Sequence, residues 1–338
     1  MKIIQRLPQL VFLSFLVACG PLSDTRSAEA DLRPPQLQAV LTTGPSELIV
    51  EFDEDATLVE DKTRITPPLV VAEITGPGRR IVIRGETQTP GRQYTLEAEA
   101  EDAKGNRASF IADFYGYNGR VPGLLINEFT PQGSGNHPDL VELKALTAGD
   151  MGGVVLYQGT PASFDNRIVF PPLEVGEGAF ILVHWKPSGD AAEVNETDDM
   201  AASKGFDASD SAWDLWIADG KGLSGTNGVL SLYDRPGGNC LDGVLYSNRT
   251  SQSDESYRGF GSAETLTRAE ELVQAGGWKP AGTRVSPEDA VNPEGSTGTR
   301  SICRQSSSAD TDSLEDWHIV PTRKATFGLE NCDEVYEP

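Results

Sequence analysis

The feature that most constrains the fold of this chain is a strict alternation of apolar and polar side chains. In residues 94–101 every second residue is tyrosine, leucine or alanine, and the residues between them are threonine or glutamate. Successive side chains of a strand point to opposite faces, so this segment predicts a β-strand with one buried and one solvent-facing side. Leu48–Phe52 alternates in the same way, and Ile81–Ile83 is a further apolar run. Short strands of this kind predict an all-β fold.

Chain length and turn-forming residues predict two β-sandwich units. With 338 residues the chain is long enough for two domains, and its 35 glycines and 22 prolines indicate many turns. We expect a first sandwich over residues 34–118 and a second unit over residues 124–332. The segment Asn118–Gly123 between them has turn formers at four of its six positions, which is typical of a domain boundary.

The first unit resembles bacterial immunoglobulin-like modules. Its alternating strand leads into Asp102-Ala103-Lys104-Gly105-Asn106, a turn, and residues 108–114 then form a returning strand. This resembles the end of such a module, and Pro34-Pro35 followed by Leu48–Phe52 fits its beginning. The resemblance implies an immunoglobulin-like sandwich. Because the unit contains no cysteine, apolar packing between the sheets would have to hold it together.

Six short segments of the second unit, taken in order, resemble a lamin-tail domain. They are residues 125–129, residues 139–143 with 150–156, residues 178–183, residues 227–234, residues 242–246, and a closing pattern at 301–304, 316–317 and 325–331. This family occurs in nuclear lamins and in many secreted bacterial proteins, and the resemblance implies an immunoglobulin-like β-sandwich. The chain departs from the family at Val154, where a tryptophan is usual, and at Phe327, where a proline is usual.

Two long segments are expected to be insertions in the lamin-tail domain. Residues 186–222 are rich in aspartate, glutamate, alanine and glycine, and residues 247–299 contain a predicted helix from Ser262 to Ala275. Ser262 can cap this helix, Gly276-Gly277 ends it, and apolar residues at positions 266, 269 and 273 share one face. Because binding residues of a sandwich usually lie on its loops, the insertions are candidate binding elements.

The amino terminus has the three parts of a secretory signal. Lys2 and Arg6 supply positive charge, residues 10–17 form an apolar run, and Ala18-Cys19 follows. The run is shorter than the roughly 20 apolar residues needed to span a bilayer. The alternatives are an ordinary signal peptide with a chance cysteine and a short anchor helix.

Leu16-Val17-Ala18-Cys19 resembles the lipobox of bacterial lipoproteins. The resemblance implies a signal peptide over residues 1–18, cleavage between Ala18 and Cys19, and fatty acids such as palmitate attached through Cys19. Residues 19–33 would then be a flexible tether. In enteric bacteria the glycine after Cys19 would favour the outer membrane.

The formal charge of −23 narrows the range of partners. A chain this acidic repels nucleic acid and anionic headgroups, and the sequence has no basic patch. We therefore expect no nucleic-acid partner. Solubility is the preferred explanation of the charge, and attraction to cations or to a basic partner is the alternative.

An acidic loop is the best metal candidate in the sequence. Its carboxylates are Asp198, Asp199, Asp207 and Asp210, with Asp214 close behind. Calcium binds six to eight oxygens, and this loop could supply several of them. The EF-hand spacing is absent, however, so a solvated loop without metal is the preferred interpretation. We expect no cofactor apart from the covalent lipid, with calcium as the alternative.

No catalytic constellation is apparent in the sequence. The Gly-x-Ser-x-Gly, His-Glu-x-x-His, Walker and dinucleotide motifs are all absent. Residues 133–137, Gly-Ser-Gly-Asn-His, are expected to form a turn, and His184 is expected to be structural or exposed. The segment Trp213–Trp216 predicts core packing, with a peptide or sugar surface as the alternative. The chain is therefore predicted not to be an enzyme.

Three cysteines remain besides Cys19, which is an odd number in a compartment that permits disulfides. We expect a disulfide between Cys303 and Cys332, because both flank the closing elements of the lamin-tail pattern. Cys240 lies in a glycine-rich hairpin turn, and pairings of Cys240 with either of the other two stay open.

These features together predict a membrane-anchored, non-enzymatic protein of the outer membrane or cell surface. It would present a lamin-tail sandwich to an unknown protein or glycan. One alternative is an accessory protein of an extracellular hydrolase or nuclease system, and another is an envelope scaffolding protein. Labelling of intact cells with an impermeant reagent distinguishes a surface location from a periplasmic one.

Overall fold

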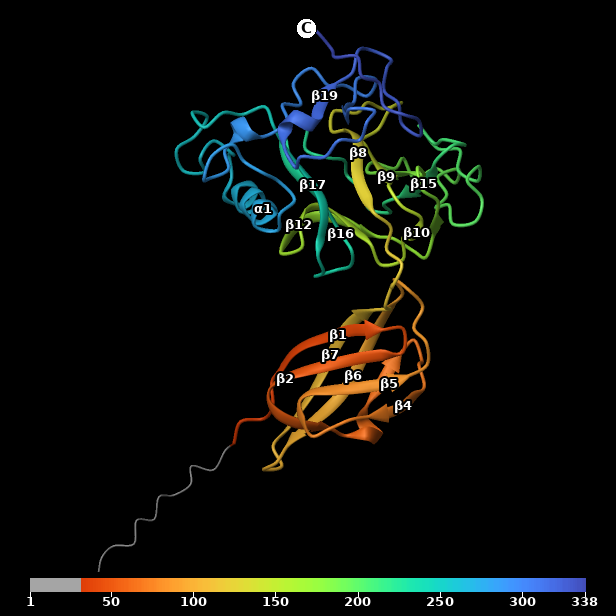
Figure 1. Cartoon of the computed structure of the whole chain (residues 1–338), viewed down its shortest axis with the longest axis vertical. Coiled ribbons are helices and arrows are strands. Elements are labelled where there is room, and N and C mark those ends of the chain that lie inside the picture. Colours follow the sequence, from red (N-terminus) through yellow and green to blue (C-terminus); the bar gives the residue numbers. More distant parts are fainter. Residues whose placement is uncertain (1–31) are drawn as a thin grey trace, which may run out of the picture.

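The computed structural model describes residues 32–338, and their fold is all-β, as the sequence predicts. The proposed signal peptide, its cleavage site and Cys19 lie outside the described residues. Within residues 32–338 no helix is long and apolar enough to cross a membrane. Two β-rich bodies lie end to end, and the chain passes from one to the other just before β8 (Leu124–Thr130) (Figure 1).

Seven strands form the first body. They are β1 (Leu37–Gly44), β2 (Glu47–Leu58), β3 (Arg64–Thr66), β4 (Val71–Ile74), β5 (Gly78–Gly85), β6 (Gln93–Asp102) and β7 (Arg107–Tyr115), with a 3-10 turn at Glu60–Lys62. Their order is β3-β6-β2-β5-β4, with β1 beside β2 and β7 beside β6. The first half of β2 pairs with β1 and β5, whereas its end pairs with β6. A single long strand therefore connects the two halves of the sheet.

The alternation of residues 94–101 is confirmed in β6. Its apolar residues are buried, and the threonine and glutamates between them are partly or fully exposed. The buried side contributes to a core of its own, made of Leu48, Val50, Phe52, Ala56, Leu58, Ile81, Ile83, Tyr94, Leu96, Ala98, Ala100 and Phe114. Full burial of a side chain such as leucine or isoleucine contributes about 1.5–3 kcal/mol, so this core is the main stabilising element of the first body.

Twelve strands form the second body. They are β8, β9 (Leu140–Ala145), β10 (Gly149–Asp150), β11 (Val155–Thr160), β12 (Ser163–Val169), β13 (Glu174–Val175), β14 (Phe180–His184), β15 (Trp213–Trp216), β16 (Asn227–Tyr233), β17 (Cys240–Ser247), β18 (Ile302–Arg304) and β19 (Trp317–Ile319). One sheet has the order β12-β11-β16-β17, and the other has the order β15-β14-β9-β8-β18-β19. Strands β10 and β13 pair separately, and 3-10 turns lie at Pro287–Asp289 and Leu314–Asp316.

The core of the second body draws on both large sheets. Strands β8, β9 and β14 contribute Ile126, Phe129, Val141, Leu143, Ile181 and Val183, and strands β11, β16 and β17 contribute Leu156, Leu230, Leu232 and Val244. Leu215 belongs to the same core and Trp216 is 7% exposed, so the core-packing interpretation of residues 213–216 is confirmed.

The two long segments of the second unit contain structure of their own. Residues 186–222 include β15, which pairs in parallel with β14. Residues 247–299 include α1 (Ala263–Gln274), which confirms the predicted helix. Ser262 caps it by accepting a hydrogen bond from the Thr265 amide at 3.1 Å. Its Ala269 is buried in the core, so the predicted apolar face packs inward.

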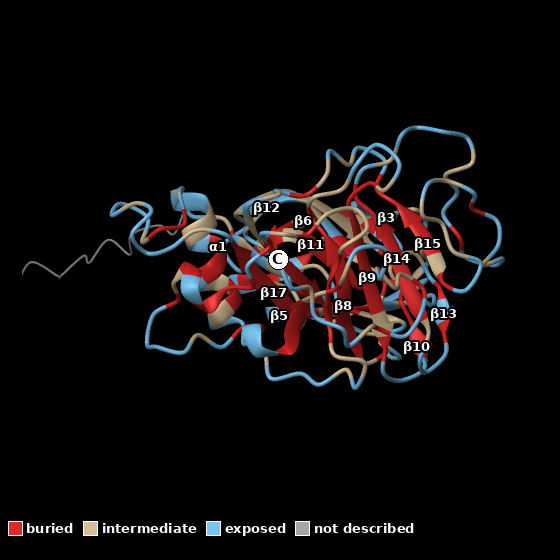
Figure 2. Cartoon of the chain, turned by 90° about the horizontal axis from the view of Figure 1, so that it is seen from above, coloured by how far each residue is buried: buried red, intermediate tan, exposed pale blue. Residues whose placement is uncertain are grey.

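The outer face of the six-stranded sheet is covered rather than wet. Glu128, Leu140, Glu142, Leu182 and His184 are all fully buried there. Figure 2 shows β8, β9 and β14 as buried strands inside a rim of exposed loops. Because ordinary alternation would expose this face, long loops must pack over it, and these loops form the candidate site.

The two bodies meet where glycines allow their backbones to approach. A Cβ atom on Gly91 would lie 2.1 Å from the Gly153 amide nitrogen, so glycine is required at this contact. The Asn118 side chain donates hydrogen bonds to the Asp150 and Gly152 carbonyls at 2.6 and 2.8 Å. The turn-rich segment that begins at Asn118 therefore also attaches the first body to the second.

Candidate functional site

A cavity of about 520 Å³ opens among loops that are far apart in the sequence. Its lining comes from the β8–β9 loop, the loop before β15, the segment before β18 and the segment after β19. The lining residues are His137, Asp207, Ala208, Ser209, Gly298, Thr299, Arg323, Ala325 and Phe327. We call this space the loop cavity. Its volume lies in the range of small-molecule sites.

The β8–β9 loop meets the loop before β15 through a histidine–aspartate contact. The Nδ1 atom of His137 lies 2.8 Å from an Asp207 carboxylate oxygen. Gly298 packs against the same histidine, because a Cβ at position 298 would lie 2.7 Å from the His137 Cβ. Three separate segments of the chain therefore meet on this side of the cavity.

A buried histidine–aspartate pair fixes the wall that contains Asp207 and Ser209. The His184 Nε2 atom lies 2.6 Å from an Asp214 carboxylate oxygen, and both side chains are 0% exposed. The other oxygen of Asp214 accepts the Ser209 amide at 2.8 Å. The His184 ring also stacks on Trp216 with a centroid separation of 3.6 Å. The sequence predicts that His184 is either structural or exposed. In the structure it is buried and has a structural role.

Two buried glutamates fix the opposite wall, which contains Phe327. Glu128 accepts hydrogen bonds from the Thr326 amide and hydroxyl, each at 2.8 Å, and another from the Ser301 hydroxyl. Glu142 accepts the Gly328 amide at 2.5 Å. Both residues flanking Phe327 are therefore bound to the sheet, which positions the Phe327 ring at the cavity.

Burial changes the ionisation of these two glutamates. Glu128 and Glu142 are register partners on β8 and β9, and both are 0% exposed. Burial raises the pKa of each carboxyl, and the charge of Glu128 raises the pKa of Glu142 further. Hydrogen bonds from the cavity wall oppose the rise in both pKa values. The attachment of this wall is therefore sensitive to the protonation of the pair.

Two residues of the cavity have an unusual backbone conformation. Asp207 has φ 60° and Arg323 has φ 65°, in the left-handed region that non-glycine residues seldom adopt. The Arg323 amide donates to the Thr299 carbonyl at 2.8 Å, which helps to hold that conformation. Such residues cluster at functional sites, where the surrounding structure compensates for their cost.

The chemistry of the lining is suited to binding. Arg323 is exposed and has no ion pair within residues 32–338, so its guanidinium is available to a ligand. Ser209 shares a hydrogen bond of 2.9 Å with the Ser211 hydroxyl, and no hydrogen bond joins it to His137 in the described part of the chain. The lining thus contains a serine, a histidine and an aspartate without the contact that would activate a nucleophile.

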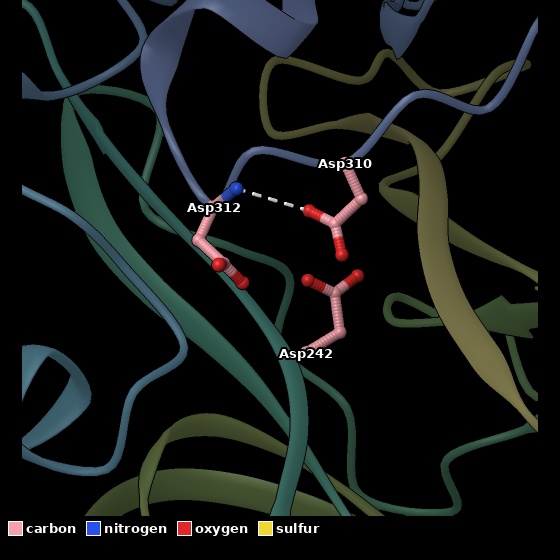
Figure 3. Close-up of side chains that lie close together, drawn as sticks. All are labelled: Asp242, Asp310 and Asp312. Carbon is pink, nitrogen blue, oxygen red and sulfur yellow. Dashed lines mark hydrogen bonds between the residues drawn. The ribbon is translucent and has the colours of Figure 1, made fainter.

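A second cluster of polar groups lies where Asp242 of β17 meets Asp310 and Asp312 of the loop after β18, and their three carboxylates gather there (Figure 3). Arg304 provides a counter-charge, with contacts of 3.0 Å to Asp242 and 3.1 Å to Asp310. Lys279 lies 2.6 Å from Asp312. Two protein cations therefore offset most of the charge of these three carboxylates, and we assign the cluster a structural role.

The side chains of Asp242 and Arg304 are both fully buried, at 0% exposure. Burial raises the pKa of Asp242 to about 7, and the guanidinium opposes the rise. Arg304 also contacts Asp316 at 3.2 Å and lies 4.7 Å from the Trp317 ring centroid. This arginine therefore connects β18 with β17 and with the segment that leads into β19.

The calcium candidates of the acidic loop are not brought together. Asp207 contacts His137 and Asp210 contacts Lys204, at 2.8 and 2.6 Å. Asp198 and Asp199 accept hydrogen bonds from groups of their own loop. Within residues 32–338 no three of these candidates lie close enough to share an ion. The weak calcium hypothesis thus gains no support from their positions.

The three cysteines of the second unit are free thiols in the structure. Cys303 and Cys332 are nevertheless neighbours, because the Cys303 sulfur lies 3.8 Å from the Cys332 carbonyl oxygen. The structure thus holds both residues as thiols with their backbones close together, and a disulfide between them stays a prediction for an oxidising compartment. Burial raises the pKa of the Cys303 thiol, so in this state it is a poor nucleophile.

Sequence reasoning did not recognise the loop cavity. The sequence predicts a turn at residues 133–137 and makes Asp207 a candidate calcium ligand. The structure brings His137 and Asp207 together across 70 positions of sequence. Arg323 and Phe327 carry no motif, because their position depends on how the closing segment packs on the sheet. Phe327 stands where the lamin-tail resemblance implies a proline, and this departure is a further signal at the site besides His137 and Asp207.

Comparison with known proteins identifies a family for the second body. A protein of Treponema pallidum (strain Nichols), named "Uncharacterized protein", is 24% identical to this chain over 159 residues. The similar region is 47% of this chain and 40% of the relative, so the chain spans less than half of that protein's length. Residues 122–319, more than half of the chain, match the family TP_1001_2nd, described as a protein second domain. The chain belongs to this TP_1001_2nd family.

Proposed function

We propose that this chain is a lipid-anchored envelope protein that binds a ligand or partner through the loop cavity of its second unit. The anchor is proposed from the lipobox-like Leu16–Cys19. A tether and an immunoglobulin-like first body would then hold the second body away from the membrane. The second body is proposed to be a lamin-tail sandwich, on the order of its sequence segments and its two facing sheets.

The observation that carries the binding proposal is the loop cavity itself. Loops from separate parts of the chain converge on it, and its two walls are fastened by buried groups. Two of the five left-handed non-glycine residues of the described chain line this hollow, and four buried ionisable side chains hold its walls. Preorganised walls of this kind lower the conformational cost of binding.

Binding without catalysis is the preferred form of this function. The Ser209 hydroxyl is hydrogen-bonded to Ser211, and the Asp207 carboxylate contacts the Nδ1 atom of His137. Purified residues 20–338 should therefore show no turnover of ester, phosphoester, peptide or glycoside substrates. Reproducible turnover that is abolished by His137→Gln would overturn the non-enzymatic part of the proposal.

A crystallographic fragment screen tests the binding site without assuming a ligand. Crystals soaked with anionic, cationic and neutral fragments should show bound fragments concentrated in the loop cavity. Ala208→Trp should fill the cavity and remove these hits, and Ala325→Phe provides a second way to fill it. Ala201→Trp is the matched control, because Ala201 is exposed on the same loop outside the lining. Fragments that bind elsewhere and leave the cavity empty would contradict the proposal.

A further inference from the structure

The loop cavity is lined by Arg323, which is one of several arginines of the described chain, Arg284 and Arg300 among them, that have no ion pair. Arg304 contacts three carboxylates and Arg268 contacts two, as expected in a chain with 51 acidic and 28 basic lysine and arginine residues. Arg323 has no ion pair in the described part of the chain. Its guanidinium therefore keeps its hydrogen-bond donors available for a ligand.

The position of Arg323 is fixed by its backbone rather than by a charged neighbour. The backbone of Arg323 has a left-handed φ of 65°, and its amide donates a hydrogen bond to the Thr299 carbonyl. These two features set the backbone conformation at position 323. The adjacent Lys324 lies 3.4 Å from Glu334, so the neighbouring basic residue is paired while Arg323 is not. The planar guanidinium of arginine matches carboxylate and phosphate groups through paired hydrogen bonds.

The rest of the lining suits the other parts of such a ligand. Among the lining residues, which all lie within residues 32–338, Asp207 is the one with a carboxylate. That carboxylate already contacts the His137 ring. Phe327, Ala208 and Ala325 provide an apolar surface. Phe327 also packs against a buried apolar cluster, which restricts the movement of its ring. The negative group of an anion with an apolar body could pair with the Arg323 guanidinium. Its apolar body could pack against Phe327, Ala208 and Ala325.

We propose that the loop cavity binds a small organic anion, a carboxylate or a phosphate on an apolar body, with the Arg323 guanidinium as its charge partner. This inference rests on the proposed function and adds the ligand's chemical class. The overall negative charge of the chain acts against the anion at long range. Salt screens that repulsion beyond about 8 Å at physiological ionic strength, whereas a guanidinium contact that the bound ligand partly buries is screened less.

Four probes that share a phenyl ring separate the effect of charge from that of the apolar body. Phenylacetate carries a carboxylate, phenyl phosphate a phosphate, 2-phenylethanol neither, and N-acetylphenylalanine imitates the carboxyl end of a peptide. Affinities would be measured for residues 20–338, which contain every described strand, by ligand-observed NMR titration. At least one anionic probe should bind at least tenfold more tightly than 2-phenylethanol, and the order among the anions identifies the preferred head group.

Substitutions locate the charge partner. Arg323→Gln should weaken the anionic probes at least tenfold and leave 2-phenylethanol within twofold. Arg323→Lys should retain part of the affinity, because it keeps the charge and loses the planar fork. Arg284→Gln is the matched control, since Arg284 is exposed, has no ion pair in the described chain and lies outside the lining. It should leave every affinity within twofold.

Failure of this inference can be separated from failure of the proposed function. If 2-phenylethanol binds as tightly as the anions and Ala208→Trp abolishes its binding, the cavity is a binding site and the anion inference is wrong. Equal losses in Arg323→Gln and Arg284→Gln would also overturn it. If no probe binds in the millimolar range, the anion inference falls, and the fragment screen decides separately on the cavity. Melting curves of each variant would show that the protein is folded.

Discussion

Replacing Arg304 by methionine is expected to destabilise the second body strongly. The side chain is 0% exposed and contacts the fully buried Asp242 through both carboxylate oxygens, at 3.0 and 3.1 Å. Methionine would fill much of the volume but would leave the Asp242 carboxylate without its cation. Removing one partner of a buried ion pair typically costs about 3–5 kcal/mol, and we expect a loss of this size in the free energy of unfolding near pH 8.

The size of this loss should depend on pH. Burial raises the pKa of Asp242 to about 7 in the folded protein, whereas the pKa of an unfolded aspartate is about 3.9. The folded state therefore keeps the proton to a higher pH, so the contribution of this group to stability falls as pH rises from about 4 through about 7. Without the opposing guanidinium the folded pKa would rise further. The cost of Arg304→Met should therefore be smaller at pH 5 than at pH 8.

Tryptophan fluorescence provides an assay that reports on the second body alone. All five tryptophans of the chain lie between residues 185 and 317, and the first body contains none. Urea unfolding followed by this signal at pH 5 and pH 8 gives the two free energies. Arg304→Lys should lose less than Arg304→Met, and adding Asp242→Asn to Arg304→Met should recover part of the loss. Arg284→Met, on the surface, should stay within about 0.5 kcal/mol of wild type.

One result would refute the reasoning. If Arg304→Met lost less than about 1 kcal/mol at pH 8, the network would contribute no more than an exposed ion pair does. A loss that was larger at pH 5 than at pH 8 would contradict the assigned direction of the Asp242 pKa.

Three further predictions concern other parts of the chain. The raised pKa values of Glu142 and Glu128 make wild-type stability fall as pH rises. The Glu142→Gln variant should therefore become more stable relative to wild type between pH 5 and pH 9. Fluorescence-detected melting tests this, and parallel pH profiles of the two proteins would contradict it. Cys19→Ser should abolish metabolic labelling with alkyne palmitate and move released protein out of the detergent phase on Triton X-114 partition, and equal labelling of both forms would count against the anchor. In an oxidising compartment Cys303 and Cys332 should form a disulfide that closes a loop of about 30 residues and adds roughly 3–4 kcal/mol in the chain-entropy model, which mass mapping of the non-reduced protein decides.

Local patterns predicted the elements of this fold. The alternation of residues 94–101 identified β6, because that strand has one core face and one solvent face. The serine cap and the glycine pair bounded α1 nearly to the residue, because both act through neighbouring backbone atoms. Burial of Trp216 also followed from its apolar neighbours. Each of these features depends on interactions within a few positions of sequence.

The candidate site was beyond such patterns, since it depends on long-range packing. Glu128 and Glu142 sit on strands where alternation predicts a wet face, yet the closing segment of the chain covers them. The partners His137 and Asp207 lie 70 positions apart. Arg304 follows an apolar pair in β18 and gives no local sign that three carboxylates surround it. Charges that are buried by distant segments have no signature in local sequence.

The most direct test of the central claim is photo-crosslinking from the loop cavity in living cells. The full-length protein would carry p-benzoylphenylalanine in place of Phe327, at the cavity, or in place of Phe164, which is 39% exposed on β12 and lies outside the lining. Intact-protein mass spectrometry of the envelope fraction detects an adduct of any size. Position 327 should give a defined adduct that disappears when Ala208→Trp fills the cavity, and position 164 should give none. No adduct at position 327, or the same adduct at both positions with Ala208→Trp having no effect, would contradict the assignment of this cavity as the binding site.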